Sequence, residues 1–175
     1  MSKRPKRLLV ELPTADEIDD LAITTPSFEV RKFEYNFPLE KADLNYPPCK
    51  GQVLVVIRGE KGTVLVRSKK PGRWGLPSGR LGIVESPVQA SRRVAMEQCG
   101  VGLRTLELAG IYDVVLHYSD MSIKRLHVVY LALTDDVECR PSSAVIAEAR
   151  FFSDPIEMTA GEEMTESALR DTERK

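Results

Sequence analysis

A run of basic side chains leads into a glycine-containing loop and could bind phosphate. Between Lys61 and Val84 the sequence carries no Asp or Glu. The basic residues of this run are Lys61, Arg67, Lys69, Lys70, Arg73 and Arg80. In a chain of net charge −1, they create a local positive field that attracts phosphates. We predict phosphate contacts from Lys70, Arg73 and Arg80, although lysines also serve simply to keep the edge of a hairpin soluble.

A helix must follow this loop and fix the position of its polar side chains. Ser86 is an N-cap residue, Pro87 suits the first helical position, and Gln89 can complete a capping box. The helix is expected to run to about Cys99, and Gly100 can end it in the left-handed conformation. A loop that leads directly into a capped helix is a common place to hold phosphate or metal.

One face of this helix could hold a divalent cation only weakly. Successive helical residues turn by about 100°, so positions 94, 97 and 98 fall within an arc of roughly 100°. They carry Val94, Glu97 and Gln98, which supply one carboxylate and one amide oxygen. Oxygen ligands suit Mg²⁺, but affinity follows the number of charged ligands. The expected cation is therefore weakly bound.

The stretch Trp74–Val101 resembles the Nudix box, the motif of hydrolases that cleave nucleoside diphosphates linked to another group. The family pattern is Gly, five residues, Glu, seven residues, and then Arg-Glu-apolar-x-Glu-Glu-x-Gly-apolar. The matching residues, which include the box glycines Gly79 and Gly100, are Gly79, Glu85, Arg93, Ala95, Glu97, Gly100 and Val101. Val94 and Gln98 replace the other two helix glutamates.

The resemblance implies a role for individual residues. Glu97 would be the catalytic carboxylate and a ligand of Mg²⁺ or Mn²⁺, with Gln98 as a second ligand. Glu148 is the first candidate for a compensating ligand, because its loop lies near the site in the family. Glu85 and Arg93 would form a structural carboxylate–guanidinium pair. The alternatives are an ion pair between Glu97 and Arg93, and a plain surface charge at Glu148.

The hydrophobic pattern favours an α+β fold with a mixed sheet. Residues 53–58 and 63–67 predict one hairpin, and residues 105–117 and 124–133 predict a second. An aromatic strand that includes Phe151 follows, and then a short helix. Two hairpins, a central helix and a final helix fit a sandwich with helices outside the sheet. The resemblance implies the α/β/α sandwich of the Nudix fold.

Three regions are expected along the chain. Residues 1–47 form an extension with a short helix over 14–22 and a strand over 27–37, in which a change of apolar phase predicts a bulge. The aromatic residues of the extension suggest a contact with its own domain or with a second subunit, which would make a homodimer. Residues 48–158 form the Nudix domain, and residues 159–175 form a polar helix or tail.

The composition favours a cytoplasmic protein. A hydrophobic content of 42% suits a core, and no apolar run approaches the length of a membrane-spanning helix. The 3 cysteines lack CxxC spacing, which indicates reduced thiols. Binding to nucleic acid is not favoured, because the basic run lacks interleaved aromatic residues.

Two functions stay open, of which the sequence favours the first. The first is a metal-dependent hydrolase that cleaves the pyrophosphate bond of a nucleoside diphosphate derivative, such as ADP-ribose, or a nucleoside triphosphate, with weak or atypical activity. The second is an inactive Nudix-fold module that binds a nucleotide or polyphosphate as a sensor or partner subunit. Trp74 could stack on a base or anchor the core. His127, placed between apolar neighbours, is expected to be structural rather than a general base.

Overall fold

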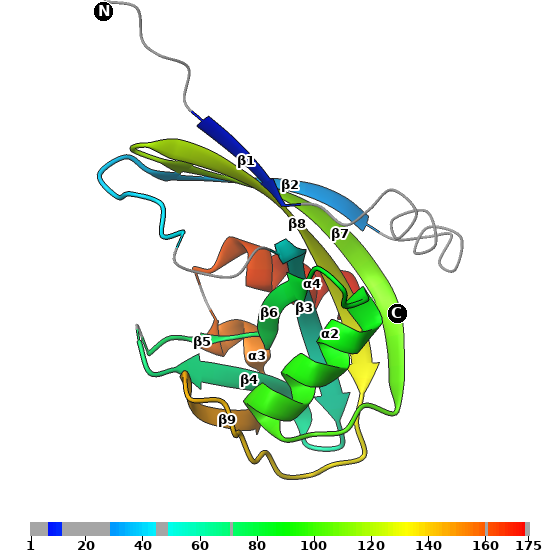
Figure 1. Cartoon of the computed structure of the whole chain (residues 1–175). Helices are drawn as coiled ribbons and strands as arrows, with labels where there is room; N and C mark the ends of the chain where they lie inside the picture. Colours follow the sequence, from blue (N-terminus) through cyan, green and yellow to red (C-terminus); the bar gives the residue numbers. More distant parts are fainter. Residues whose placement is uncertain (1–6, 12–28, 45–48, 71, 160, 174–175) are drawn as a thin grey trace, which may run out of the picture.

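The computed structural model describes residues 7–11, 29–44, 49–70, 72–159 and 161–173. Its described strands form one nine-stranded sheet (Figure 1). The strands are β1 (Arg7–Glu11), β2 (Glu29–Phe37), β3 (Cys49–Gly59), β4 (Gly62–Ser68), β5 (Trp74–Gly75), β6 (Ser78–Gly82), β7 (Thr105–Tyr118), β8 (Met121–Leu133) and β9 (Ile146–Phe152). Their order is β2-β7-β8-β3-β4-β5, with β1 beside β8, β6 beside β3 and β9 beside β4. The helix expected over residues 14–22 lies outside the described residues.

Two antiparallel hairpins joined by a parallel pair make the sheet mixed. β3 pairs with β4 next to their turn, at Arg58↔Thr63, and β7 pairs with β8 along most of its length. β3 runs parallel to β8 from Gln52↔His127 to Arg58↔Leu133. Both predicted hairpins and the mixed sheet are therefore confirmed.

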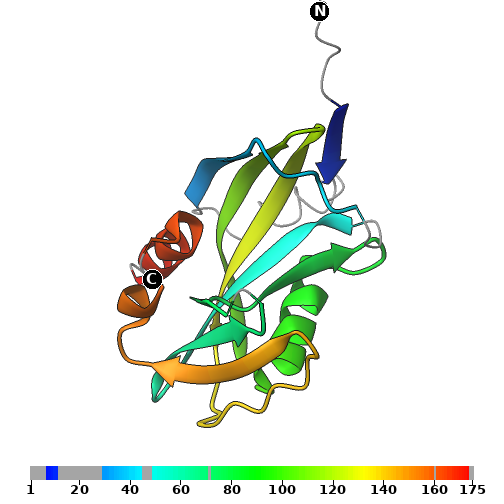
Figure 2. The same cartoon turned by 90° about the vertical axis from the view of Figure 1, so that its left-hand side faces the viewer.

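Helices cover both faces of the sheet. They are α2 (Pro87–Val94), which continues into the π-helical turn η1 (Ala95–Cys99), α3 (Pro155–Met158) and α4 (Glu163–Glu173). Because side chains alternate along a strand, Val55 of β3 packs with Ala95 on one face and Leu54 packs with Leu169 on the other. Figure 2 shows α2 on one side of the sheet and α3 and α4 on the opposite side. The expected α/β/α sandwich is confirmed.

Helix α4 is an integral part of the packed structure. Leu169 is 1% exposed and belongs to the core between α4 and the sheet. The Asp171 carboxylate accepts hydrogen bonds from the Tyr112 hydroxyl and the Arg31 Nε, both at 2.7 Å. The packing therefore continues beyond residue 158, after which only a polar helix or tail was expected.

Strand β2 is regular where a bulge was expected. It pairs with β7 in parallel and in one continuous register over Glu29–Phe37. Phe33 is buried in the core on the α4 side, whereas Val30 on the other face is 63% exposed. The change in apolar phase therefore reflects an exposed valine, and the predicted bulge is wrong for the described part of this segment.

The N-terminal strands extend the sheet beyond the sandwich. β1 runs parallel to the first residues of β8, and β3 runs parallel to the rest, so β1 and β3 lie one after the other beside the same strand (Figure 1). The segment after β2 is tied to the β7–β8 turn, because Ser119 N donates to Glu40 O at 2.8 Å and Ala42 N donates to Asp120 Oδ1 at 3.0 Å. A contact of residues 1–47 with a second subunit stays a prediction.

Candidate functional site

The helix of the box begins and ends at the residues that the sequence indicates. The Ser86 hydroxyl accepts from Gln89 N at 3.1 Å, and Ser86 N donates to Gln89 Oε1 at 3.0 Å, which completes the capping box. Gly100 ends the helix with a φ of 67°. A Cβ at this position would lie 2.1 Å from the carbonyl oxygen of Arg140. The close approach of these two segments of the backbone therefore requires a glycine.

The helix packs tightly on β6 through the first box glycine. Val94 is 1% exposed and lies in a core cluster with Val53, Leu81 and Ala90. A Cβ on Gly79 would come within 2.7 Å of Val94 Cγ2, so the absence of a side chain permits this contact. Val94, which stands where the family pattern has a glutamate, is thus part of the apolar core.

Glu85 and Arg93 connect the loop, the helix and β6. Arg93 donates to the Glu85 carboxylate from Nε at 2.7 Å and from Nη2 at 2.9 Å. Nη2 also donates to Arg80 O at 2.9 Å, and Gly82 N donates to Glu85 Oε2 at 3.2 Å. The hydrogen bonds from Arg93 lower the pKa of Glu85 below its ordinary value. These contacts support the structural role expected for the pair.

Gln98 is bound through both ends of its amide to the backbone of Ser78. Ser78 N donates to Gln98 Oε1 at 3.2 Å, and Gln98 Nε2 donates to Ser78 O at 2.6 Å. On the other side, Val55 N of β3 donates to Pro77 O at 3.0 Å. Since the direction of backbone groups alternates along a strand, those of Ser78 point away from β3 and toward the helix. The amide oxygen that was expected to bind a metal thus has a protein donor.

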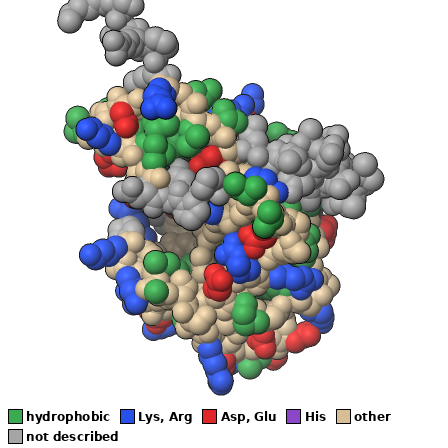
Figure 3. Space-filling view, in the orientation of Figure 1, with side chains coloured by type: hydrophobic (Ala, Val, Ile, Leu, Met, Phe, Trp, Pro, Cys, Tyr) green, Lys and Arg blue, Asp and Glu red, His purple; other side chains and the backbone are tan. Residues whose placement is uncertain are grey.

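Glu97 is the half-exposed carboxylate of the box helix. Its side chain is 53% exposed and lies 3.4 Å from Arg93 Nη1, the ion pair that the sequence offered as an alternative. Its carbonyl accepts hydrogen bonds from Ser142 N at 2.9 Å and Ser143 N at 2.8 Å. Figure 3 shows acidic and basic side chains next to one another on the face that carries α2. A catalytic role for Glu97 stays a prediction.

Glu148 lies on the opposite face of the sheet from Glu97. In the register of β4 and β9, Ala149 is opposite Val66, and both pack on the η1 side. Glu148 precedes Ala149 and therefore points to the α4 side, where it forms ion pairs with Arg67 at 3.0 Å and with Arg150. The structure does not bring Glu148 to the box, which corrects the expectation of a compensating metal ligand there.

The residues at the box do not fit a cation site of several carboxylates. Val94 is apolar and buried, Gln98 is hydrogen-bonded to Ser78, and Glu97 contacts an arginine. Over the described ranges, no group of three or more His, Cys, Asp and Glu side chains could hold a metal ion. Weak binding of Mg²⁺ or Mn²⁺ through Glu97 and Gln98 stays a prediction.

The basic run borders a cleft on the α4 side of the sheet. The cleft has a volume of about 520 Å³ and is lined by Arg73 and Trp74 before β6 and by residues around the α3–α4 connection. The latter residues are Met158, Thr159, Gly161 and Glu162. Arg73 and Lys70 are both exposed, on either side of the β4–β5 turn. Two of the predicted phosphate-binding side chains thus come from one connection, and Arg73 lines the cleft.

Trp74 is both a core anchor and a wall of this cleft. Phe152 packs edge-on against the indole with ring centroids 4.8 Å apart. The guanidinium carbons of Arg67 and Arg150 lie 5.7 Å and 6.0 Å from the ring centroid. At one end of the cleft, the indole therefore lies beside two arginines that pair with Glu148 and next to the exposed Arg73.

Arg80, the third predicted phosphate ligand, is in a different place. It lies in β6 opposite Gln52, one residue away from the Gly79↔Val53 pair that faces the box helix. Its side chain therefore belongs to the α4 side of the sheet. Arg80 does not line the cleft at Trp74.

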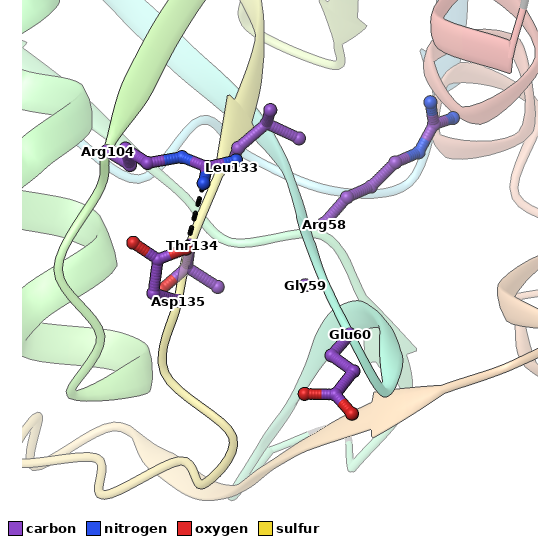
Figure 4. A pocket seen from close by; sticks show the side chains of 7 residues that line it. All are labelled: Arg58, Gly59, Glu60, Arg104, Leu133, Thr134 and Asp135. Atoms are coloured by element: carbon purple, nitrogen blue, oxygen red, sulfur yellow. Dashed lines mark ion pairs between the residues drawn. The ribbon is translucent and has the colours of Figure 1, made fainter.

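A smaller pocket of about 240 Å³ lies where β3 and β8 end (Figure 4). Figure 4 shows Arg104 and Asp135 turned toward one another, and their ion pair measures 3.1 Å. Arg58 points away toward α4, where its Nη1 donates to Thr172 O at 2.8 Å. Because both arginines have protein partners, this pocket is a weaker candidate for an anion than the cleft at Trp74.

Sequence reasoning missed the α3–α4 wall of the cleft and the contact between Gln98 and Ser78. The wall carries no basic or aromatic residue, so it gave no signal in the sequence. The contact between Gln98 and Ser78 did leave a signal in the sequence, namely an amide where the family pattern has a carboxylate. An amide can donate a hydrogen bond as well as accept one.

The comparisons with known proteins place the chain in one fold. A family model described as "NUDIX domain" matches residues 50–170. The search among curated proteins found no match.

Several solved structures share this fold. The NUDIX domain of Shewanella oneidensis NrtR complexed with ADP ribose superposes with a TM-score of 0.57 at 20% identity, over 73% of this chain and 94% of that one. A MutT NUDIX hydrolase from Burkholderia pseudomallei gives 0.55 at 22% identity, over 69% and 95%. A C. elegans Ap4A hydrolase gives 0.54 at 17% identity, over 70% and 94%. Separately, none of the described helices has the length and apolar character needed to cross a membrane.

Proposed function

The chain belongs to the Nudix family, and from this premise we propose that it binds a nucleoside diphosphate derivative in the cleft between Arg73 and the α3–α4 connection. In this proposal the box helix is a scaffold that fixes β6 and the preceding loop. The protein then acts as a nucleotide-binding module with little or no hydrolysis of its ligand.

The observation that carries the proposal is the meeting of Arg73 and Trp74 in one cleft. The volume of about 520 Å³ lies within the range of roughly 300–1,000 Å³ that is usual for small-molecule sites. Arg73 is exposed and can bind a phosphate through two parallel hydrogen bonds. Trp74 offers an aromatic surface for a base, while Arg67 and Arg150 beside it pair with Glu148, so the phosphate contact is assigned to Arg73.

The state of the box favours binding over turnover. Hydrolases of this family generally use divalent cations. Here Glu97 is the remaining carboxylate of the three helix positions, and Glu148 is on the other face of the sheet. The loss of one properly placed charged group commonly costs several kcal/mol of transition-state stabilisation, and two such groups are replaced.

The single tryptophan of the chain provides a direct test, because its fluorescence reports on this cleft. We expect ADP-ribose and ADP to change the emission of Trp74 in the presence of EDTA, as binding needs no cation. Arg73→Ala should weaken binding about tenfold or more, through the loss of a charged hydrogen bond. Arg140→Ala is the control, since this arginine is 83% exposed and lies outside the cleft. Equal weakening in both variants, or no binding by the wild type, would contradict the proposal.

Metal-dependent hydrolysis is the second candidate, favoured by the half-exposed Glu97 in the register of the box. It predicts release of phosphate or nucleotide from nucleoside diphosphate derivatives only with Mg²⁺ or Mn²⁺, and loss of this activity in Glu97→Gln. The binding module predicts that Glu97→Gln leaves the affinity for ADP-ribose unchanged. Turnover and affinity measured on the same two proteins separate the candidates.

A further inference from the structure

We infer that Gln98 is a positioning residue for the box loop, by which we mean residues 78–85, that is, β6 and the turn before the box helix. It fixes the start of this loop directly through hydrogen bonds, so that the loop holds its conformation without a divalent cation. The inference rests on the contact between the Gln98 amide and the backbone of Ser78. It concerns the loop itself and does not depend on the binding of a nucleotide.

The contact uses both the donor and the acceptor of the amide, which a carboxylate cannot do. Ser78 presents one donor, its N–H, and one acceptor, its carbonyl oxygen. Gln98 accepts from the first through Oε1 and donates to the second through Nε2. A carboxylate has the same shape but accepts only. A glutamate at position 98 would keep the hydrogen bond from Ser78 N and would place negative charge against Ser78 O, at the position where Nε2 now lies 2.6 Å away.

A divalent cation could relieve that repulsion. Mg²⁺ and Ca²⁺ take both carboxylate and backbone carbonyl oxygens as ligands. With a glutamate at position 98, the Ser78 carbonyl and the new carboxylate would form two such ligands side by side. Gln98 connects the helix and the loop in the same way, but the N–H of its amide takes the place of the cation.

The contact between Gln98 and Ser78 is one of three contacts between the box helix and β6. Arg93 donates to the carbonyl of Arg80, Val94 packs on Gly79, and Gln98 holds Ser78. Three consecutive residues of β6 are therefore fixed to the helix. None of these contacts involves Glu97.

The test compares thermal unfolding with Mg²⁺ and with EDTA in three proteins. The wild type should unfold at the same temperature in both. Gln98→Glu should unfold about 5 °C lower in EDTA, from the lost hydrogen bond and the repulsion, and should recover at least half of this loss in millimolar Mg²⁺. Potassium at equal ionic strength should not restore it.

Gln89→Glu is the matched control. It introduces the same charge on the same helix, but the Gln89 side chain only accepts from Ser86 N, which a carboxylate does equally well. This variant should show no Mg²⁺-dependent shift. A similar Mg²⁺ stabilisation of the wild type, or a Gln98→Glu protein that Mg²⁺ does not restore, overturns the inference.

Hydrogen exchange in the wild type provides a second measurement if Gln98→Glu fails to fold. The amide of Ser78 should be protected from exchange, and its protection should be the same in Mg²⁺ and in EDTA. Protection that appears only with Mg²⁺ would overturn the inference. Neither measurement contains a nucleotide, so failure here leaves the proposed binding function to be judged by Trp74 fluorescence alone.

Discussion

At the scale of the residue, identity alone predicted some roles and not others. Ser86 and Gly100 act within their own stretch of chain, so their roles in the box helix could be predicted from the sequence. The role of Gln98 depends on the direction in which the backbone of Ser78 points, and that direction is set by the pairing of β6 with β3. The face on which Glu148 lies depends likewise on the register of β9. Tertiary pairing of this kind is not encoded in local spacing.

His127 provides a test at the same scale. It is 6% exposed, and burial together with the nearby charge of Arg125 lowers its pKa to about 4 from 6.5, against an opposite effect of Glu11. Between these pH values an unfolded chain binds a proton that the folded protein does not. Stability should therefore fall as the pH drops from about 6.5 to about 4, by on the order of 3 kcal/mol from this residue.

Urea unfolding at several pH values measures this contribution. His127→Gln should lose the part of the pH dependence that lies in this window. His117→Gln, which changes the other of the 2 histidines, should retain it. Sequence and burial both indicate that His127 is a neutral structural residue. If both variants show the same pH dependence of stability as the wild type, that interpretation is wrong.

At the scale of the element, the helices and hairpins were predictable and their long-range partners were not. The box helix is capped by its own neighbours, and each hairpin closes across a short turn. The parallel pairs β2–β7 and β3–β8 join segments that are far apart in the sequence. An exposed Val30 was enough to suggest a bulge that the pairing with β7 does not contain.

Gly100 has two reasons to be a glycine, its positive φ and its close approach to Arg140. Comparing three glycines separates the two effects. Gly100 has a φ of 67° and faces Arg140 O, Gly161 has a φ of 90° in open space, and Gly75 has neither feature. We expect Gly100→Ala to cost more than about 2 kcal/mol, Gly161→Ala about 1 kcal/mol, and Gly75→Ala close to nothing. Chemical denaturation of the three variants provides the comparison. Equal losses for Gly100→Ala and Gly161→Ala would show that the contact with Arg140 is unimportant.

At the scale of the whole molecule, α4 and the box helix stabilise opposite faces of one sheet. Residues of β3 alternate between the two cores, so a change in either layer acts on the strand that both share. The amphipathic character of α4 was too weak in the sequence to predict this role, because its buried anchors include the polar residues Asp171 and Thr172.

Leu169→Ala tests the contribution of α4. The side chain is 1% exposed, so the substitution should lower the free energy of unfolding by about 2–4 kcal/mol. Met158→Ala is the control, since Met158 is 41% exposed on α3. Both free energies follow from urea denaturation monitored by the fluorescence of Trp74. A loss of less than about 1 kcal/mol in Leu169→Ala would mean that α4 is dispensable for the fold.

The place of β1 beside β8 has a consequence for how the chain acquires its structure. Arg7 pairs with Met121 and Glu11 pairs with Arg125, so β1 leaves the ribosome well before its partner strand, which lies more than half of this chain away. Such high contact order makes the pairing slow, since a long loop must close first. During synthesis β1 must wait, without its final neighbour, until the second long hairpin has emerged. The N-terminal strand is therefore expected to join the sheet late in folding, after β7 and β8 have provided the edge to which it binds.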